Sequence, residues 1–170
     1  MKIRLFDSRD VTAYRELRLK ALIESPTAFA SCYEQEVCLS TIDFATRIQT
    51  NARSGGGFFG AFDDSERLIG MIGFSLENRS KRSHVGSLRS MYVLPEFRHQ
   101  GVGARLLDEA LSHIRTLGIL RQLVLSVTAN NLAASSLYKS RGFERFGLER
   151  DALLIDGKYF DRKHLVLFLK

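Results

Sequence analysis

The sequence Arg98-His99-Gln100-Gly101-Val102-Gly103 separates an apolar run, which ends at Val93, from the clearest amphipathic segment of the chain, residues 101–117. Two glycines at positions i and i+2 allow the backbone to approach a ligand closely, because no Cβ intervenes. A helix that follows such a loop presents unpaired N–H groups and the positive end of its dipole. This combination is typical of a phosphate or pyrophosphate site. A tight turn without a ligand is the alternative.

Outward from this loop, hydrophobic periodicity predicts strands and helices in alternation. Helices are expected over residues 11–25, 40–53, 101–117 and 131–141. Strands are expected over residues 2–6, 58–62, 68–76, 85–93, 123–127, 143–148 and 164–169. The acidic segment 63–66 predicts a hairpin, and the strand–helix–strand order of the second half predicts a parallel pair. An α/β fold with a mixed sheet and helices on both faces follows.

Length and composition predict one globular domain over residues 1–170, without internal repeats. A hydrophobic content of 45% and a charged content of 26% exclude disorder and coiled coil as the main state. No apolar run approaches ~20 residues, so no membrane span is expected. The N-terminus is charged within its first residues and has no signal-peptide core, which favours a cytoplasmic protein.

Metal binding is not predicted. Cys32 and Cys38 lack a CxxC spacing, and the four histidines lack the spacing of metal ligands.

A second motif lies about thirty residues beyond the first. It reads Asn131-x-x-Ala134-x-x-Leu137-Tyr138, followed by Gly142-Phe143. Ala134, Leu137 and Tyr138 have the spacing of one helix face. Tyr138 on its own could equally be a core aromatic residue with a satisfied hydroxyl.

The two motifs together, in this order and spacing, resemble the signatures of the GNAT superfamily of N-acetyltransferases, and the order of strands and helices matches over essentially the whole chain. The resemblance implies a central, mostly antiparallel sheet of about seven strands, a splayed parallel pair and about four flanking helices. It implies acetyl-CoA as co-substrate. The residues expected to hold it are Met91, Tyr92, Val93, Arg98, His99, Gln100, Gly101, Val102, Gly103, Ala104, Asn131, Ala134 and Tyr138.

The reaction implied is direct attack of an acceptor amine on the acetyl thioester. Tyr138 matches the tyrosine general acid of the family, and a backbone N–H near Val93 would polarise the carbonyl. Several members carry a glutamate base at about the position of Ser87, and serine cannot replace it unaided. Glu77, His84 or a chain of waters are the open alternatives.

The acceptor is expected to contact the segment between the first two helices, at Phe29, Tyr33, Glu34 and Glu36. Its two carboxylates would attract a cationic amine. A solvated acidic loop is the alternative. The acceptor class stays open between small-molecule amines and peptides.

Two rival functions remain at this point. A net charge of +6 and the basic loop at residues 79–82 are compatible with a nucleic-acid-binding module, although no RNA- or DNA-binding signature supports it. An acyl-CoA-binding regulator without turnover is the other rival, and Tyr138 argues against it. Dimers are common among similar proteins, so a homodimer is also open.

Overall fold

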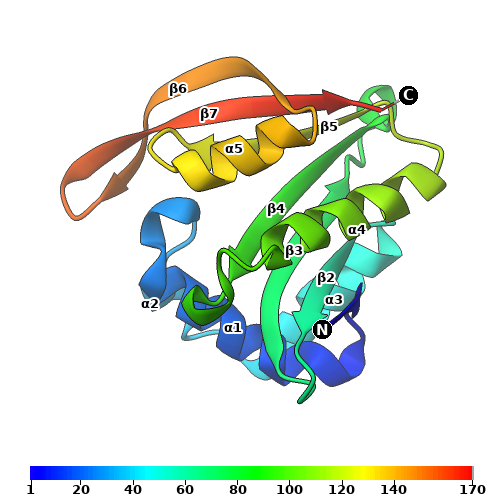
Figure 1. The fold of residues 1–170 in the computed structure, drawn as a ribbon, viewed down its shortest axis with the longest axis vertical. Coiled ribbons are helices and arrows are strands. Elements are labelled where there is room, and N and C mark those ends of the chain that lie inside the picture. Colours follow the sequence, from blue (N-terminus) through cyan, green and yellow to red (C-terminus); the bar gives the residue numbers. More distant parts are fainter. Residues whose placement is uncertain (170) are drawn as a thin grey trace.

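Seven strands form one sheet in the order β1-β2-β3-β4-β5-β7-β6 in the computed structural model, which describes residues 1–169 (Figure 1). The predicted domain end at residue 170 lies outside the described residues. The strands are β1 Lys2–Leu5, β2 Gly57–Phe62, β3 Leu68–Leu76, β4 Val85–Val93, β5 Gln122–Thr128, β6 Glu144–Ile155 and β7 Lys158–Phe168. All neighbours are antiparallel except β4 and β5. The predicted mixed, mostly antiparallel sheet is confirmed.

Helices cover both faces of the sheet. The α-helices are α1 Val11–Glu24, α2 Tyr33–Glu36, α3 Thr41–Arg53, α4 Val102–Thr116 and α5 Leu132–Ser140. Residues 1–169 thus contain five α-helices where about four were expected, because α2 forms one turn in the predicted loop. Phe58 packs on Tyr14 of α1, whereas Phe59 packs on His113 of α4. Adjacent strand residues point to opposite faces, so α1 and α4 lie on opposite sides of β2.

Burial on both faces explains the composition of the central strands. All six residues of β2 and the first seven of β3 are buried. Such strands read as continuous apolar runs rather than alternating ones. None of the helices within residues 1–169 has the length and apolarity that a membrane span requires.

The parallel pair of strands is short. β4 and β5 are paired only from Val85 with Gln122 to Ser87 with Val124. β4 continues to Val93 and β5 to Thr128, so the two strands separate, as the resemblance implied. β4 also bulges where it leaves β5: its register against β3 shifts, and Ser90 has a φ of 55°. Bulges bend a strand and re-aim its side chains, and they are common beside functional sites.

The last two strands form a hairpin that is longer than predicted. The sequence indicated strands only over residues 143–148 and 164–169, but the hairpin continues to a two-residue turn at Asp156-Gly157. Both turn residues have positive φ, 50° and 74°, as a type I′ turn requires. Two register shifts interrupt the alternation of β6, at residues 145–147 and 149–153, and obscured it in the sequence. The hairpin curves over α5 and towards α2 (Figure 1).

Candidate active site

A cavity of about 1030 Å³ lies where β4 and β5 separate. Its wall combines Ser90 and Met91 of β4 with Ser126 of β5 and Tyr138 of α5. It continues to the opposite side of the sheet, where side chains of α1 and α3 line it. The cavity therefore joins the predicted cofactor side of the sheet to the predicted acceptor side.

The backbone of Val93 faces this gap. Val93 pairs with Gly70, and the N–H of Leu94 donates to the carbonyl of Ile69 at 2.9 Å. In an antiparallel ladder, this bond marks Val93 and Gly70 as a pair that does not exchange hydrogen bonds. The N–H and C=O of Val93 therefore point away from β3, towards the side on which β5 has separated. Consistent with this direction, Nε of Arg98 donates to the Val93 carbonyl at 2.9 Å.

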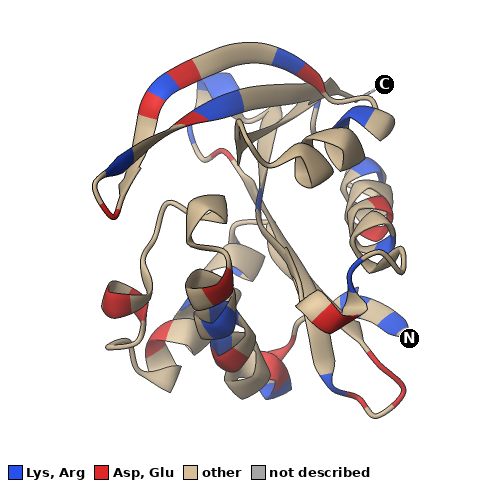
Figure 2. Ribbon diagram, turned by 60° about the vertical axis from the view of Figure 1, so that its left-hand side comes forward, with Lys and Arg blue, Asp and Glu red and all other residues tan. Residues whose placement is uncertain are grey.

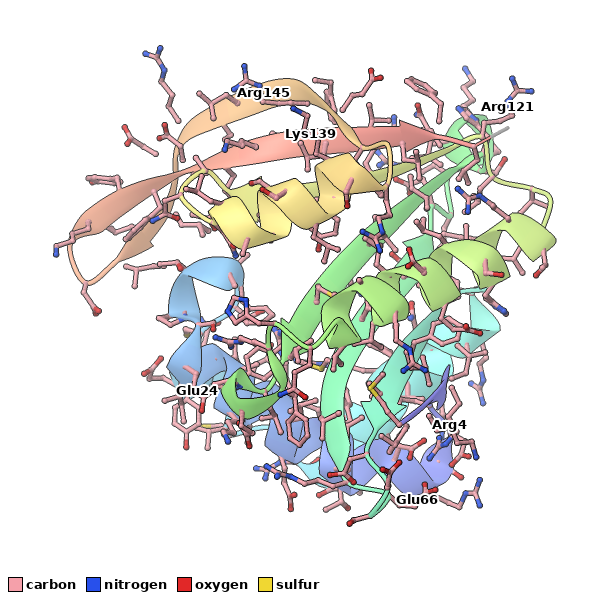
Figure 3. All side chains as sticks on the ribbon, viewed as in Figure 1. Arg4, Glu24, Glu66, Arg121, Lys139 and Arg145 are labelled. Atoms are coloured by element: carbon pink, nitrogen blue, oxygen red, sulfur yellow. The ribbon has the colours of Figure 1, made fainter. Side chains whose placement is uncertain are left out.

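Tyr92 is directed away from the gap, which corrects its predicted place in the cofactor set. The alternation of the ladder turns its backbone groups towards Met71 of β3. Its side chain is 4% exposed, and its hydroxyl donates to Glu24 at the end of α1. Burial and the neighbouring Glu24 carboxylate raise the pKa of Tyr92. Figure 3 shows Glu24 on the α1 side of the molecule, below the gap.

The glycine loop enters α4 with a left-handed backbone. Gly101 is the N-cap of α4 and has a φ of 79°, and His99 has a φ of 60°. The first intrahelical bond runs from the N–H of Arg105 to the carbonyl of Gly101, so the N–H groups from Val102 to Ala104 have no partner within the helix. A Cβ on Gly103 would lie 3.2 Å from Cε of Met91, which places this end of α4 beside the cavity wall.

Tyr138 presents an unengaged hydroxyl in the cavity wall. Its ring packs edge-on against Phe143 at 5.6 Å, and the residue is 6% exposed. Burial raises the pKa of Tyr138, with no contribution from a hydrogen bond. A hydroxyl in this state keeps its proton and is available as a donor.

Asn131 and Ala134 also line the cavity, at the start of α5. The side-chain oxygen of Asn131 accepts a hydrogen bond from the Ala134 N–H at 3.0 Å and so caps the helix. The amide nitrogen of Asn131 has no part in this cap and stays available to a ligand.

The predicted acceptor residues divide into two groups. Phe29 and Glu36 line the cavity, whereas Tyr33 and Glu34 do not. Glu36 is 4% exposed, and its oxygens accept hydrogen bonds from Arg18 at 2.8 Å and 3.1 Å and from Arg47 at 2.8 Å. Burial alone would raise the pKa of Glu36, but these hydrogen bonds outweigh it and lower the pKa to about 2.

The expectation that Glu36 attracts a cation therefore needs correction. Its one negative charge is already matched by two guanidinium groups, so it offers no free charge to an amine. Positive charge predominates in the whole cavity wall. The charged residues that line it are Glu36 and the arginines Arg18, Arg47, Arg82, Arg89 and Arg162. Figure 2 shows basic residues on β6 and β7 above the gap and on α1 below it, with acidic residues on the same elements.

A chain of hydrogen bonds in the wall was missed at the sequence level. The hydroxyl of Ser126 lies 2.9 Å from Nδ1 of His164, and Nε2 of His164 lies 2.9 Å from a carboxylate oxygen of Glu149. Ser126 and His164 both line the cavity. The three residues come from β5, β7 and β6, so only the pairing of these strands brings them together.

The bases considered at the sequence level lie elsewhere. Neither Glu77 nor His84 lines the cavity. Glu77 is held by Arg79 at 2.7 Å, which lowers the pKa of its carboxyl to about 2. Ser87 does line the cavity, and its hydroxyl is 2.8 Å from that of Ser75. Within the described chain, no group of three or more His, Cys, Asp or Glu side chains could hold a metal ion.

Comparison with known proteins identifies the family to which this chain belongs. The sequence profile of the acetyltransferase (GNAT) family matches residues 19–143. Because this match covers well over half of the chain, the protein belongs to the GNAT family.

Individual relatives agree with this family. A mycothiol acetyltransferase from Geodermatophilus obscurus is 35% identical over 95 residues, which are 55% of this chain and 30% of that protein. The N-alpha-acetyltransferase RimI from Mycobacterium tuberculosis is 34% identical over 106 residues, which are 62% of this chain and 58% of that protein. The matches thus span less than two thirds of either relative.

A solved structure shows the same fold. It is a phosphinothricin acetyltransferase of the GNAT superfamily from Sinorhizobium meliloti in complex with AcCoA. It superposes with a TM-score of 0.88 at 24% identity, over 99% of this chain and 88% of that one.

Proposed function

We propose that the protein transfers an acetyl group from acetyl-CoA to a primary amine of a small molecule or peptide. The observation that carries this proposal is the cavity itself. One continuous space passes between the separated strands β4 and β5, with the Tyr138 hydroxyl in its wall and arginine side chains at its far side. Membership of the GNAT family supports the same reaction.

The chain offers a suitable place for each part of the co-substrate. Unpaired N–H groups at the start of α4, with Arg98 beside them, suit the pyrophosphate of CoA. The free edge of β4 suits the amide groups of the pantetheine arm, because Val93 presents its N–H there. Acetyl-CoA supplies the activated acetyl group as a thioester.

Two groups of this chain would stabilise the transfer. The Val93 N–H would donate to the thioester oxygen as negative charge develops on it. The Tyr138 hydroxyl would give its proton to the departing sulfur, and its burial keeps that proton in place until then.

The attacking amine must also lose a proton. Nδ1 of His164 would accept it through the Ser126 hydroxyl, while the Glu149 carboxylate holds the other ring nitrogen and stabilises the imidazolium that forms. This chain of three side chains fills the role for which Ser87 alone is unsuited.

The test is a thiol-release assay with acetyl-CoA and a panel of amines and peptides. We expect amine-dependent release of CoA and a mass increase of one acetyl group on the amine. If the protein binds acetyl-CoA but releases no CoA with any amine, an acyl-CoA-binding regulator without turnover would be favoured instead. Dimer formation stays a prediction, and sedimentation would measure it.

A further inference from the structure

The acceptor end of the cavity holds more positive charge than the protein itself balances. Arg18 and Arg47 share the single carboxylate of Glu36. Arg89 extends from β4 into the same region, and its hydrogen bond goes to the neutral side-chain oxygen of Asn51 at 2.8 Å. Three guanidinium groups therefore face one carboxylate.

The buried member of this group is also incompletely bonded. Arg18 is 6% exposed, and its Nη1 is enclosed without a hydrogen-bond partner. An enclosed cation that lacks full compensation is costly, so proteins normally balance it with an anion. Its guanidinium lies 4.6 Å from the ring centre of Phe29, which holds the group in place at the cavity wall.

Arg89 is the member best placed to meet a ligand. Its side chain is exposed in the cavity and rests over the ring of Phe58 at 5.5 Å. The side chain is only partly enclosed by the cavity wall, but this partial burial is the main cause that lowers the pKa of Arg89, and the charges of Arg47 and Arg18 act in the same direction. Arg18, Arg47 and Arg89 all line this cavity, and an anion bound among them would offset their like charges.

We infer that the acceptor amine carries a carboxylate, which Arg89 and Arg47 bind with added attraction from Arg18. The inference rests on the proposed acetyl transfer and names the class of acceptor. Guanidinium groups bind carboxylates through parallel hydrogen bonds, and the walls of a cavity strengthen that attraction. The carboxylate is either the α-carboxylate of an amino acid or an acidic side chain next to a peptide N-terminus.

The test compares matched acceptors with and without this carboxylate. L-alanine is set against L-alaninamide, and the amide of the dipeptide Ala-Glu against that of Ala-Gln. We expect a carboxylate member of one pair to exceed its neutral partner by about 10- to 100-fold in kcat/KM, the range for a hydrogen bond to a charged group. The pair that shows the preference identifies the source of the carboxylate. An equal or greater rate with the neutral partners, or with spermidine, would overturn the inference and leave acetyl transfer intact.

Matched variants locate the effect. Arg89→Gln should remove most of the preference for the carboxylate, because it keeps a polar side chain but loses the charge. Arg79→Gln makes the same change outside the cavity and should leave the preference unchanged. If Arg89→Gln keeps the full preference, the carboxylate binds elsewhere and the inference is wrong.

A binding measurement decides the question without turnover. N-acetyl-L-alanine and N-acetyl-L-alaninamide are titrated by calorimetry into protein saturated with CoA. At least tenfold tighter binding of the acid is expected, with that difference lost in Arg89→Gln. Equal affinities in this pair, together with equal affinities of the N-acetylated amides of Ala-Glu and Ala-Gln in the same titration, would refute the inference even if no amine were acetylated.

Discussion

Replacement of Tyr138 by phenylalanine separates a catalytic hydroxyl from a structural one. The ring stays against Phe143, and the hydroxyl that is lost has no hydrogen-bond contribution from the protein. The free energy of unfolding should therefore change by less than ~0.5 kcal/mol, as expected when no bond is broken. Removal of a general acid typically lowers the rate by ~10²–10⁴-fold, equivalent to about 3–5 kcal/mol in the barrier.

Tyr92→Phe is the matched control, because it removes a tyrosine hydroxyl at a residue that does not line the cavity. Its hydroxyl donates to the Glu24 carboxylate and lies away from the cavity. A hydrogen bond to a charged group contributes ~1.5–3 kcal/mol, so this variant should lose roughly 3–12 °C in Tm while kcat stays near the parent value. The two substitutions should thus give opposite results: Tyr138→Phe should lower kcat but not Tm, and Tyr92→Phe should lower Tm but not kcat.

The assays are thermal unfolding and thiol release with both substrates saturating. Because burial raises the pKa of Tyr138, the parent rate should show no loss of this proton up to about pH 10, the ordinary pKa of tyrosine. If Tyr138→Phe kept its kcat per folded molecule and lost stability instead, the general-acid role would be refuted.

Three other perturbations test the cofactor loop, the buried acid and the proton acceptor. Gly101→Ala should weaken CoA binding at least tenfold by calorimetry. Gly118 at the other end of α4 also has a positive φ and open space around a Cβ, so Gly118→Ala should bind CoA like the parent. Equal losses of CoA affinity in both variants would show an effect of backbone strain alone. Glu36 should stabilise the fold fully above about pH 4.5, and this contribution, about 3 kcal/mol, should disappear as the pH falls towards about 2. Urea unfolding should therefore show a large deficit for Glu36→Gln at pH 7 that narrows by pH 3, and a constant deficit would contradict the assigned pKa. His164→Gln should lower kcat by ~10²-fold, as expected for loss of a general base. His84 lies outside the cavity, so His84→Gln should leave kcat unchanged. An equal fall of kcat in both variants would show that His164 is not the proton acceptor.

Local patterns in the sequence predicted most of the fold. The glycine loop before α4 and the apolar runs of β2 and β3 each act within a few residues, and the corresponding elements form where expected. The full length of the last hairpin was missed, because bulges break the period-2 pattern of β6. Asp156-Gly157 was the available signal, since this dipeptide is typical of a two-residue hairpin turn.

The site was predicted only in part, because two of its features depend on residues far apart in the sequence. Glu36 was interpreted as a free acidic group, but Arg18 and Arg47 reach it from two other helices. The chain from Ser126 to Glu149 likewise needs the pairing of three strands. Residues 29–36 considered on their own therefore did not predict the excess of arginine side chains in the cavity wall.

The short pairing between β4 and β5 has a consequence for motion. Among the residues that the structure describes, three residue pairs join the β1–β4 part of the sheet to the β5–β7–β6 part, and all three lie at one end, from Val85 to Ser87. Beyond Ser87, the facing edges of these strands have no partner strand to protect their amide hydrogens from exchange with water. A ligand arm bound along the edge of β4 would supply the missing acceptors and restrain the two half-sheets relative to each other. The amide of Val93 should then exchange with deuterium more slowly in the presence of CoA, while the amides of β2 and β3 exchange slowly with or without it.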